Sequence, residues 1–200
     1  MKWHRKVIIS SIVLLALTAC SMRNEKRDFK SLVFAEGDLV FRRGFGTKSE
    51  AVLYADASGI YSHTGIVVRL DSVFRIVHIT PGEEPGDMIK ADLPEEFWAS
   101  GKAEYGALYR LKNASPYAAE AAQQALRLLR KGIMFDHDYQ LNDSTKMYCT
   151  EMVWYAYLLA GKDVTSGKRS VLENVPMYSG TYIFPSDIYS NDEFTLIYKF

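Results

Sequence analysis

The segment from Tyr148 to Gly161 constrains the fold of this chain more than any other. Apolar side chains such as Met152, Val153 and Ala156 recur on nearly every face of a helix drawn over it. A helix that is apolar all round belongs in a protein core. Gly161 is a natural stop, because glycine accepts the left-handed conformation that follows a last helical turn. Capping oxygens are available just upstream, from Asp143, Ser144 and Thr145. The pattern therefore predicts a buried helix with a cysteine in its first turn.

That cysteine, Cys149, is a candidate nucleophile. Unpaired N–H groups and the positive end of the helix dipole favour a thiolate, which is the reactive form of the side chain. The same N–H groups could hold an oxyanion after the sulfur attacks a carbonyl carbon. The alternative is an inert buried cysteine, since free cysteine is among the most buried residue types.

The N-terminus carries an export signal. Three basic residues within the first six precede the apolar run Val7–Leu17, which is too short to span a bilayer as a mature helix. The run ends in Leu17-Thr18-Ala19-Cys20, which resembles a bacterial lipobox. The resemblance implies cleavage before Cys20 and attachment of lipid to its sulfur. An ordinary secretory signal that contains a cysteine is the alternative.

These features predict three parts of the chain. Residues 1–19 are expected to be a lipoprotein signal peptide, residues 20–35 a polar tether, and residues 36–200 one globular domain. We expect the protein in the bacterial cell envelope, anchored to a membrane by its N-terminal lipid and facing the periplasm or the exterior.

The cysteine count bears on the role of Cys149. The chain has 2 cysteines, and the lipid would occupy Cys20. Cys149 would then have no intramolecular disulfide partner in a compartment where disulfides persist. A lone exported thiol is exposed to oxidation, so its presence is easier to understand if it has a chemical function.

Composition excludes one class of partner. Lysine and arginine together number 24, as do aspartate and glutamate, so the formal net charge is zero. The chain therefore has no charge excess that would favour nucleic acid. At 200 residues with 48% hydrophobic content, it is long enough for one domain with a substantial core.

Two β-branched segments place two histidines together. Ile60–Val68 and Phe74–Thr80 are both expected to be strands. If they form a hairpin around a four-residue loop at 69–72, His63 lies directly opposite His78 on the same face. A slip of one residue would place the two rings on opposite faces.

The remaining elements follow from periodicity and from helix-breaking or turn-forming residues. We expect a strand after a turn at Gly37–Arg43, a short helix in Lys48–Ala55, a turn-rich loop at Pro81–Asp92, a helical turn at Pro94–Ala99, a strand at Glu104–Leu111, an amphipathic helix from Ser115-Pro116 through Arg130, an aromatic and acidic loop at Ile133–Met147, and a terminal strand at Phe194–Phe200. The fold class is α+β.

These motifs resemble a known superfamily. Gly37-Asp38-Leu39-Val40-Phe41 and Ser62-His63-Thr64-Gly65-Ile66-Val67 are similar to the strand motifs of NlpC-type papain-like cell-wall peptidases. In those enzymes the cysteine helix precedes the strands, whereas here Tyr148-Cys149-Thr150-Glu151 follows them. That order resembles the circularly permuted branch, the YiiX/YaeF-like amidases, with lecithin:retinol acyltransferase as a more distant relative. The resemblance implies an antiparallel sheet of about five strands packed on a buried nucleophile helix.

The resemblance also implies roles for three side chains. Cys149 would be the nucleophile, His63 the general base and acid, and His78 the group that orients His63. Glu151 matches the family pattern but is expected to be structural, and Tyr148 is expected to pack rather than to donate to an oxyanion. His137 is expected to be a solvated loop residue.

The expected function is that of a cysteine hydrolase that cleaves an amide through a thioester. The export signal favours an amide in cell-wall peptides as substrate. A lipid amidase or acyltransferase is an alternative, as is an inactive lipoprotein that binds a ligand in its cleft. The spacing of acids and histidines shows no metal-ligand pattern, so we expect neither metal nor cofactor.

Overall fold

A computed structural model describes residues 29, 31–81, 87–113, 116–141, 143–173 and 178–200. The predicted signal peptide and Cys20 lie outside these residues. Among the described residues, no helix is both long and apolar enough to cross a membrane.

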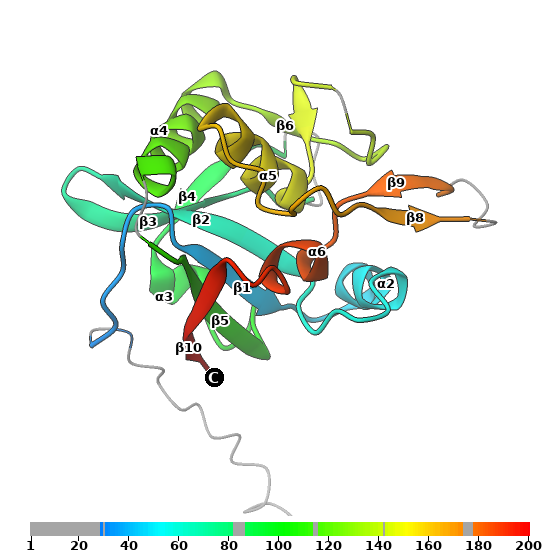
Figure 1. The fold of residues 1–200 in the computed structure, drawn as a ribbon. Coiled ribbons are helices and arrows are strands. Elements are labelled where there is room, and N and C mark those ends of the chain that lie inside the picture. The colour runs from blue at the N-terminus through cyan, green and yellow to red at the C-terminus, as the bar shows by residue number, and fades with distance from the viewer. Residues whose placement is uncertain (1–28, 30, 82–86, 114–115, 142, 174–177) are drawn as a thin grey trace, which may run out of the picture.

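The centre of the fold is a six-stranded antiparallel sheet in the order β10-β5-β1-β2-β3-β4 (Figure 1). Its strands are β1 (Leu39–Arg43), β2 (His63–Leu70), β3 (Val73–His78), β4 (Lys90–Asp92), β5 (Tyr105–Leu111) and β10 (Phe194–Lys199). The helices are α2 (Thr47–Ala55), α3 (Pro94–Phe97), α4 (Pro116–Lys131), α5 (Cys149–Leu159) and α6 (Pro185–Tyr189). Two small sheets pair β6 (Met134–Phe135) with β7 (Lys146–Met147), and β8 (Ser170–Leu172) with β9 (Gly180–Tyr182). The predicted α+β class is confirmed.

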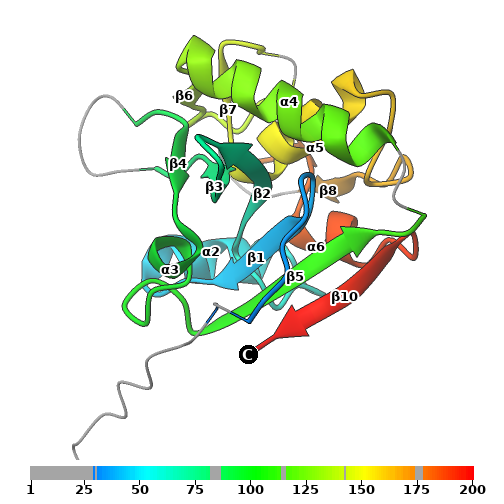
Figure 2. The ribbon, with the colours of Figure 1, turned by 90° about the vertical axis from the view of Figure 1, so that its left-hand side faces the viewer.

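Each face of the central sheet carries its own apolar cluster. One contains Ile66, Val68 and Val77 from the strands, packed against α4 and α5, which lie together above the sheet in Figure 2. The other contains Val67 and Ile76, and packs against α3. Because successive side chains of a strand point to opposite faces, β2 and β3 alternate between the two clusters. The sheet is therefore the middle layer of the domain.

The second cluster includes residues that the sequence assigned to the tether. Phe29 is 5% exposed and contacts the rings of Trp98, Tyr198 and Phe200. The Arg110 side chain donates to the carbonyl of Val33. The packed body thus includes residues N-terminal to the predicted domain start at Glu36.

Helix α5 carries Cys149 in its first turn and ends before Gly161 as predicted, but it is less buried, and none of Asp143, Ser144 and Thr145 caps it. Its cap is Tyr148, with extended backbone, and Gly161 follows the helix with φ of 89°. The side toward the sheet and α4 is buried, whereas Leu158 and Leu159 near the end are exposed. The prediction of all-round burial is therefore wrong for the last turn, where the side chains of Leu158 and Leu159 face solvent.

The β2–β3 hairpin differs from its predicted register by two residues. Leu70 pairs with Val73, so the loop has only Asp71 and Ser72, both at positive φ. Such two-residue loops suit the twist of a hairpin. Because the shift is an even number of residues, His63 and His78 stay on one face, but they are diagonal neighbours rather than directly opposite.

Strand β4 was not predicted. It lies in the last part of the segment expected to be a turn-rich loop, and it pairs with β3 at the edge of the sheet. Three residues are too few to show the alternation by which a strand is recognised. The β8–β9 hairpin and α6 also fall in a segment for which the sequence predicted no element.

Candidate active site

The sulfur of Cys149 lies where α5 meets the start of β2. Cys149 is the first residue of the helix, and the backbone N–H groups of Thr64, Thr150 and Cys149 itself are directed at its side chain. The carboxylate of the buried Glu151 accepts from the backbone N–H of Tyr148 at 3.4 Å. This bond joins the cap to the first turn of the helix, as expected for a structural residue.

The protonation of Cys149 differs from the expectation that a helix start would favour the thiolate. Burial raises the pKa of the thiol, and the Thr64 and Thr150 N–H groups and the charge of Arg42 oppose this without reversing it. Desolvation of the charged form therefore outweighs the helix terminus. A resting thiol needs a base to remove its proton.

His63 is the first residue of β2 and pairs with Arg42 of β1. Its ring stacks on Phe97 of α3 with a centroid distance of 5.5 Å. Burial, followed by the charges of Arg42, His78 and Lys90, lowers the pKa of His63 well below its ordinary value. The ring is therefore neutral at pH 7 and able to accept a proton.

The two histidines are in direct contact. His63 Nε2 lies 2.9 Å from Nδ1 of His78, which is fully buried. Gly65 makes this approach possible, because a Cβ there would lie 2.6 Å from Ile76 Cγ2 and 3.0 Å from His78 Cβ. The prediction that the two rings share a face and lie close together is thus confirmed, whereas the prediction that they lie directly opposite each other is wrong.

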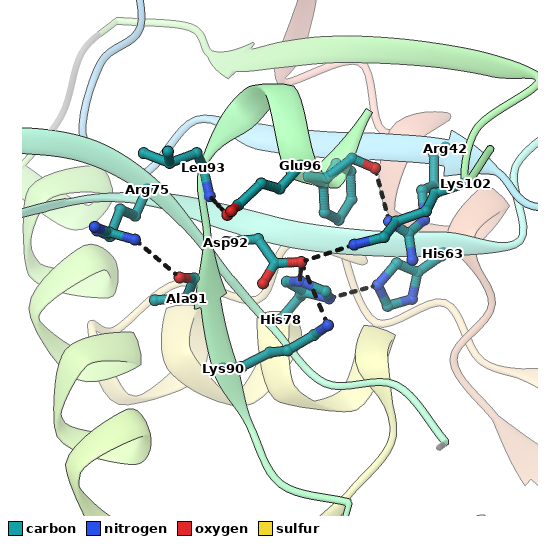
Figure 3. A network of polar contacts seen from close by, with 11 residues as sticks. Arg42, His63, Arg75, His78, Lys90, Ala91, Asp92, Leu93, Glu96 and Lys102 are labelled. Atoms are coloured by element: carbon teal, nitrogen blue, oxygen red, sulfur yellow. Dashed lines mark hydrogen bonds and ion pairs between the residues drawn. The ribbon is translucent and has the colours of Figure 1, made fainter. Parts of the chain in front are cut away.

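Sequence reasoning missed a carboxylate behind the histidines. Asp92 of β4 has Oδ2 3.0 Å from His78 Nε2 (Figure 3). The same oxygen lies 3.3 Å from Lys90 Nζ and 3.7 Å from Lys102 Nζ. Burial raises the pKa of Asp92, but the contact with His78 and the neighbouring charges lower it by more, so the pKa falls well below its ordinary value. The missed strand β4 is the reason this residue was not found.

A cavity of about 580 Å³ adjoins these groups and is lined by both Cys149 and His63. Among the described residues that line it there is no carboxylate, but there are four cationic side chains: Arg42, Lys48, Lys90 and Lys102. Arg42 donates to the Phe97 carbonyl at 2.7 Å, and burial lowers its pKa only to about 10, so it keeps its charge at neutral pH. The cavity thus gives a substrate access to both the sulfur and the imidazole.

A second cavity of about 530 Å³ lies beside the first, between α2 and the β8–β9 hairpin. Tyr139, Tyr182 and Phe184 line both cavities. The residues that line only the second cavity are mainly apolar or aromatic and include Tyr54 and Tyr178. The cavity next to Cys149 therefore adjoins a more apolar one.

Two other polar residues singled out in the sequence lie around the site. The Tyr148 hydroxyl accepts from the Ile183 N–H at 2.9 Å, which ties α5 to the segment before α6. The side chain of His137 is 66% exposed, 3.8 Å from Asp87 Oδ2, in agreement with a solvated loop position.

Comparison with known proteins decides the family. Residues 33–198 match the family described as permuted papain-like amidase enzyme, YaeF/YiiX, C92 family. The chain belongs to this permuted papain-like amidase family. The resemblance to YiiX/YaeF-like amidases, inferred above from the sequence motifs, is thereby confirmed.

A solved structure supports the permuted papain-like fold. The chain is similar to the crystal structure of metalloprotein yiiX from Escherichia coli O157:H7, with 22% sequence identity and a TM-score of 0.66. The match covers 82% of this chain and 97% of the E. coli chain. A search of curated proteins gave no match.

Proposed function

We propose that this member of the amidase family is a cysteine hydrolase that cleaves an amide bond through a thioester. Cys149 is the nucleophile, His63 the general base and acid, and His78 the residue that orients His63. The observation that carries the proposal is the shared cavity: it is lined by Cys149 and His63, and Nε2 of His63 contacts His78.

The reaction begins with transfer of the Cys149 proton to the neutral imidazole of His63. The sulfur attacks the amide carbon, and the oxyanion forms where the first-turn N–H groups of α5 lack helical partners. His63 then protonates the leaving nitrogen, and the C–N bond breaks to leave a thioester. Water attacks the thioester while His63 takes its proton. The C–S bond breaks, the acid leaves, and the proton returns to sulfur.

We propose a cell-envelope peptide or other amide as the substrate. The supporting features are the basic N-terminus, the apolar run and the lipobox-like Leu17–Cys20, which together would place the domain on a membrane outside the cytoplasm. Lipid attached to Cys20 would be the anchor.

A lipid amidase or acyltransferase is the second candidate. It is favoured by the apolar cavity beside the site, where Tyr54, Leu172 and Tyr178 could surround an acyl chain. A catalytically inactive lipoprotein that binds a ligand in the cavity is the third.

The metal that the E. coli relative's name mentions does not fit this site. Within the described ranges, no group of three or more His, Cys, Asp or Glu residues could hold a metal ion. His78 instead contacts His63 on one side and Asp92 on the other. We therefore assign no step to a metal.

The deciding experiment offers the purified protein purified muropeptides and, separately, N-acyl lipids, and identifies products by mass spectrometry. We expect amine and acid release from muropeptides, with an acyl adduct on Cys149 of the intact protein and no reaction by Cys149→Ala. Release of fatty acid alone would favour the second candidate. Binding without turnover of either substrate class would favour the third.

A further inference from the structure

We propose that Asp92 is a positioning residue that sets the tautomers of both histidines and thereby leaves His63 Nδ1 free to accept the Cys149 proton. The inference rests on the proposed function, because it concerns how the same base is prepared. It adds Asp92 as a fourth residue to Cys149, His63 and His78, with both imidazole rings between its carboxylate and Nδ1 of His63.

The three side chains form a line across three neighbouring strands. Asp92 on β4 contacts His78 on β3, and His78 contacts His63 on β2, at 3.0 Å and 2.9 Å (Figure 3). The pairing of β3 with β4 places His78 opposite Lys90, so Asp92 is two residues away on the same face. Both contacts are therefore diagonal cross-strand pairs.

The carboxylate of Asp92 can act only as a hydrogen-bond acceptor. Lys90 and Lys102 lie within ion-pair distance of its Oδ2, and the carboxyl is ionised at neutral pH. An ionised carboxylate has no proton to donate. A lone pair on His78 Nε2 would repel this carboxylate at 3.0 Å, so Nε2 must carry the hydrogen, although the N–H is not aligned on Oδ2 as in a regular hydrogen bond.

The tautomer of His78 then determines that of His63. Burial lowers the pKa of His78 to about 4, although Asp92 acts in the opposite direction, so the ring is neutral at pH 7. A neutral imidazole with hydrogen on Nε2 has a lone pair on Nδ1. His78 Nδ1 thus accepts from His63 Nε2.

The same rule applies to the neutral ring of His63. With its hydrogen on Nε2, its Nδ1 bears the lone pair. This is the nitrogen that remains for the thiol proton, since the other is engaged by His78. If the hydrogens were reversed along the line, Nδ1 of His63 would be blocked, and His78 Nε2 would present a lone pair to a carboxylate.

Phe97 and Arg42 hold the rings in this arrangement. Phe97 stacks on His63 and meets His78 edge-on at a centroid distance of 5.0 Å. The guanidinium of Arg42 lies 4.6 Å from the Phe97 ring centroid. Packing therefore restricts ring rotation, and Asp92 selects which nitrogens carry hydrogen.

The test compares Asp92→Ala with Asp92→Asn in the full chain. Alanine removes the hydrogen-bond acceptor. The Oδ1 of asparagine can still accept a hydrogen bond, because the position faces His78 Nε2 and the ammonium groups of Lys90 and Lys102. We expect Asp92→Ala to slow alkylation of Cys149 by iodoacetamide by about 10- to 100-fold, below the loss expected for removal of the base itself. Asp92→Asn should recover part of that rate.

A direct readout is the two-bond ¹H–¹⁵N correlation spectrum of the histidine rings. In the unsubstituted protein, His63 and His78 should both be protonated at Nε2, and Asp92→Ala should produce a mixture of tautomers. Glu96→Ala is the matched control: it removes a carboxylate of α3 that accepts from the Leu93 N–H at 2.7 Å. It should leave the ring spectra and the alkylation rate unchanged.

Hydrogen on Nδ1 of His63 in the unsubstituted protein would overturn the proposal, even if Asp92→Ala fails to fold. Unchanged tautomers in Asp92→Ala would overturn it as well. Failure of the hydrolase proposal would look different, because Cys149→Ala would then leave turnover intact while the tautomers still depended on Asp92.

Discussion

The two halves of the site are held in place by different means. Cys149 is positioned by the backbone: it occupies the first turn of a helix whose N–H groups, with that of Thr64, face the sulfur. His63 is positioned by side chains, through His78, Asp92 and the ring of Phe97. The sulfur half should therefore tolerate changes in neighbouring side chains, whereas single substitutions should disturb the histidine half.

The largest expected effect is loss of either proposed reacting group. Cys149→Ser and His63→Ala should each reduce amide turnover by about 10³-fold or more, because a weak nucleophile or a missing base cannot be replaced by its neighbours. Turnover and thermal melting should be measured together. His137→Ala, at an exposed histidine, serves as the control. Equal turnover by Cys149→Ser and the unsubstituted protein would refute the thioester mechanism.

The next largest effect on turnover is expected from loss of His78, which lies between His63 and Asp92. His78→Ala should reduce turnover by about 10²-fold, since it leaves the buried His63 Nε2–H without an acceptor. His78→Asn should retain more activity, because its amide oxygen can occupy the place of Nδ1. Steady-state rates of the two variants test this. Equal losses would mean that His78 acts by packing alone.

The histidine half should also make stability depend on pH. The pKa of His78 is lowered by burial from 6.5 to about 4, so below pH 6.5 the unfolded chain binds the proton more tightly than the folded one. The free energy of unfolding should fall as pH falls from 6.5 toward 4, by up to about 3 kcal/mol for this residue. The lowered pKa of His63 acts in the same direction.

Urea unfolding at a series of pH values measures this loss. Between about pH 6.5 and 5 most carboxylates remain ionised, so histidines dominate the slope there. His78→Asn should make the slope smaller. A stability that stays constant over this range would contradict burial of neutral imidazoles.

The smallest expected effect lies on the sulfur side. Tyr148→Phe removes the hydroxyl that accepts from the Ile183 N–H. We expect a loss of about 1–2 kcal/mol in unfolding free energy, with less than about a tenfold change in turnover. Denaturant unfolding and steady-state rates measure the two quantities. A much larger fall in turnover at unchanged stability would instead make Tyr148 an oxyanion donor.

The sequence predicted the sulfur half better than the histidine half. The apolar periodicity of 148–161 is local, so both the helix and its first-turn cysteine could be foreseen. The register of the hairpin was wrong by two residues, because Asp71-Ser72 lacks the Asn-Gly or Asp-Gly signal of a two-residue loop. The shared face of His63 and His78 survived, since the side-chain period of a strand is also two.

Sequence alone determined the elements whose signal is local: the cysteine helix with its glycine stop, the amphipathic α4, and two strands with a histidine each. Only the tertiary structure decided that Asp92 stands behind His78, because the pairing of a three-residue edge strand depends on contacts across the sheet. It also decided the direction of the Cys149 pKa. A helix terminus can be recognised from sequence, but the desolvation that outweighs it depends on every element packed around the sulfur.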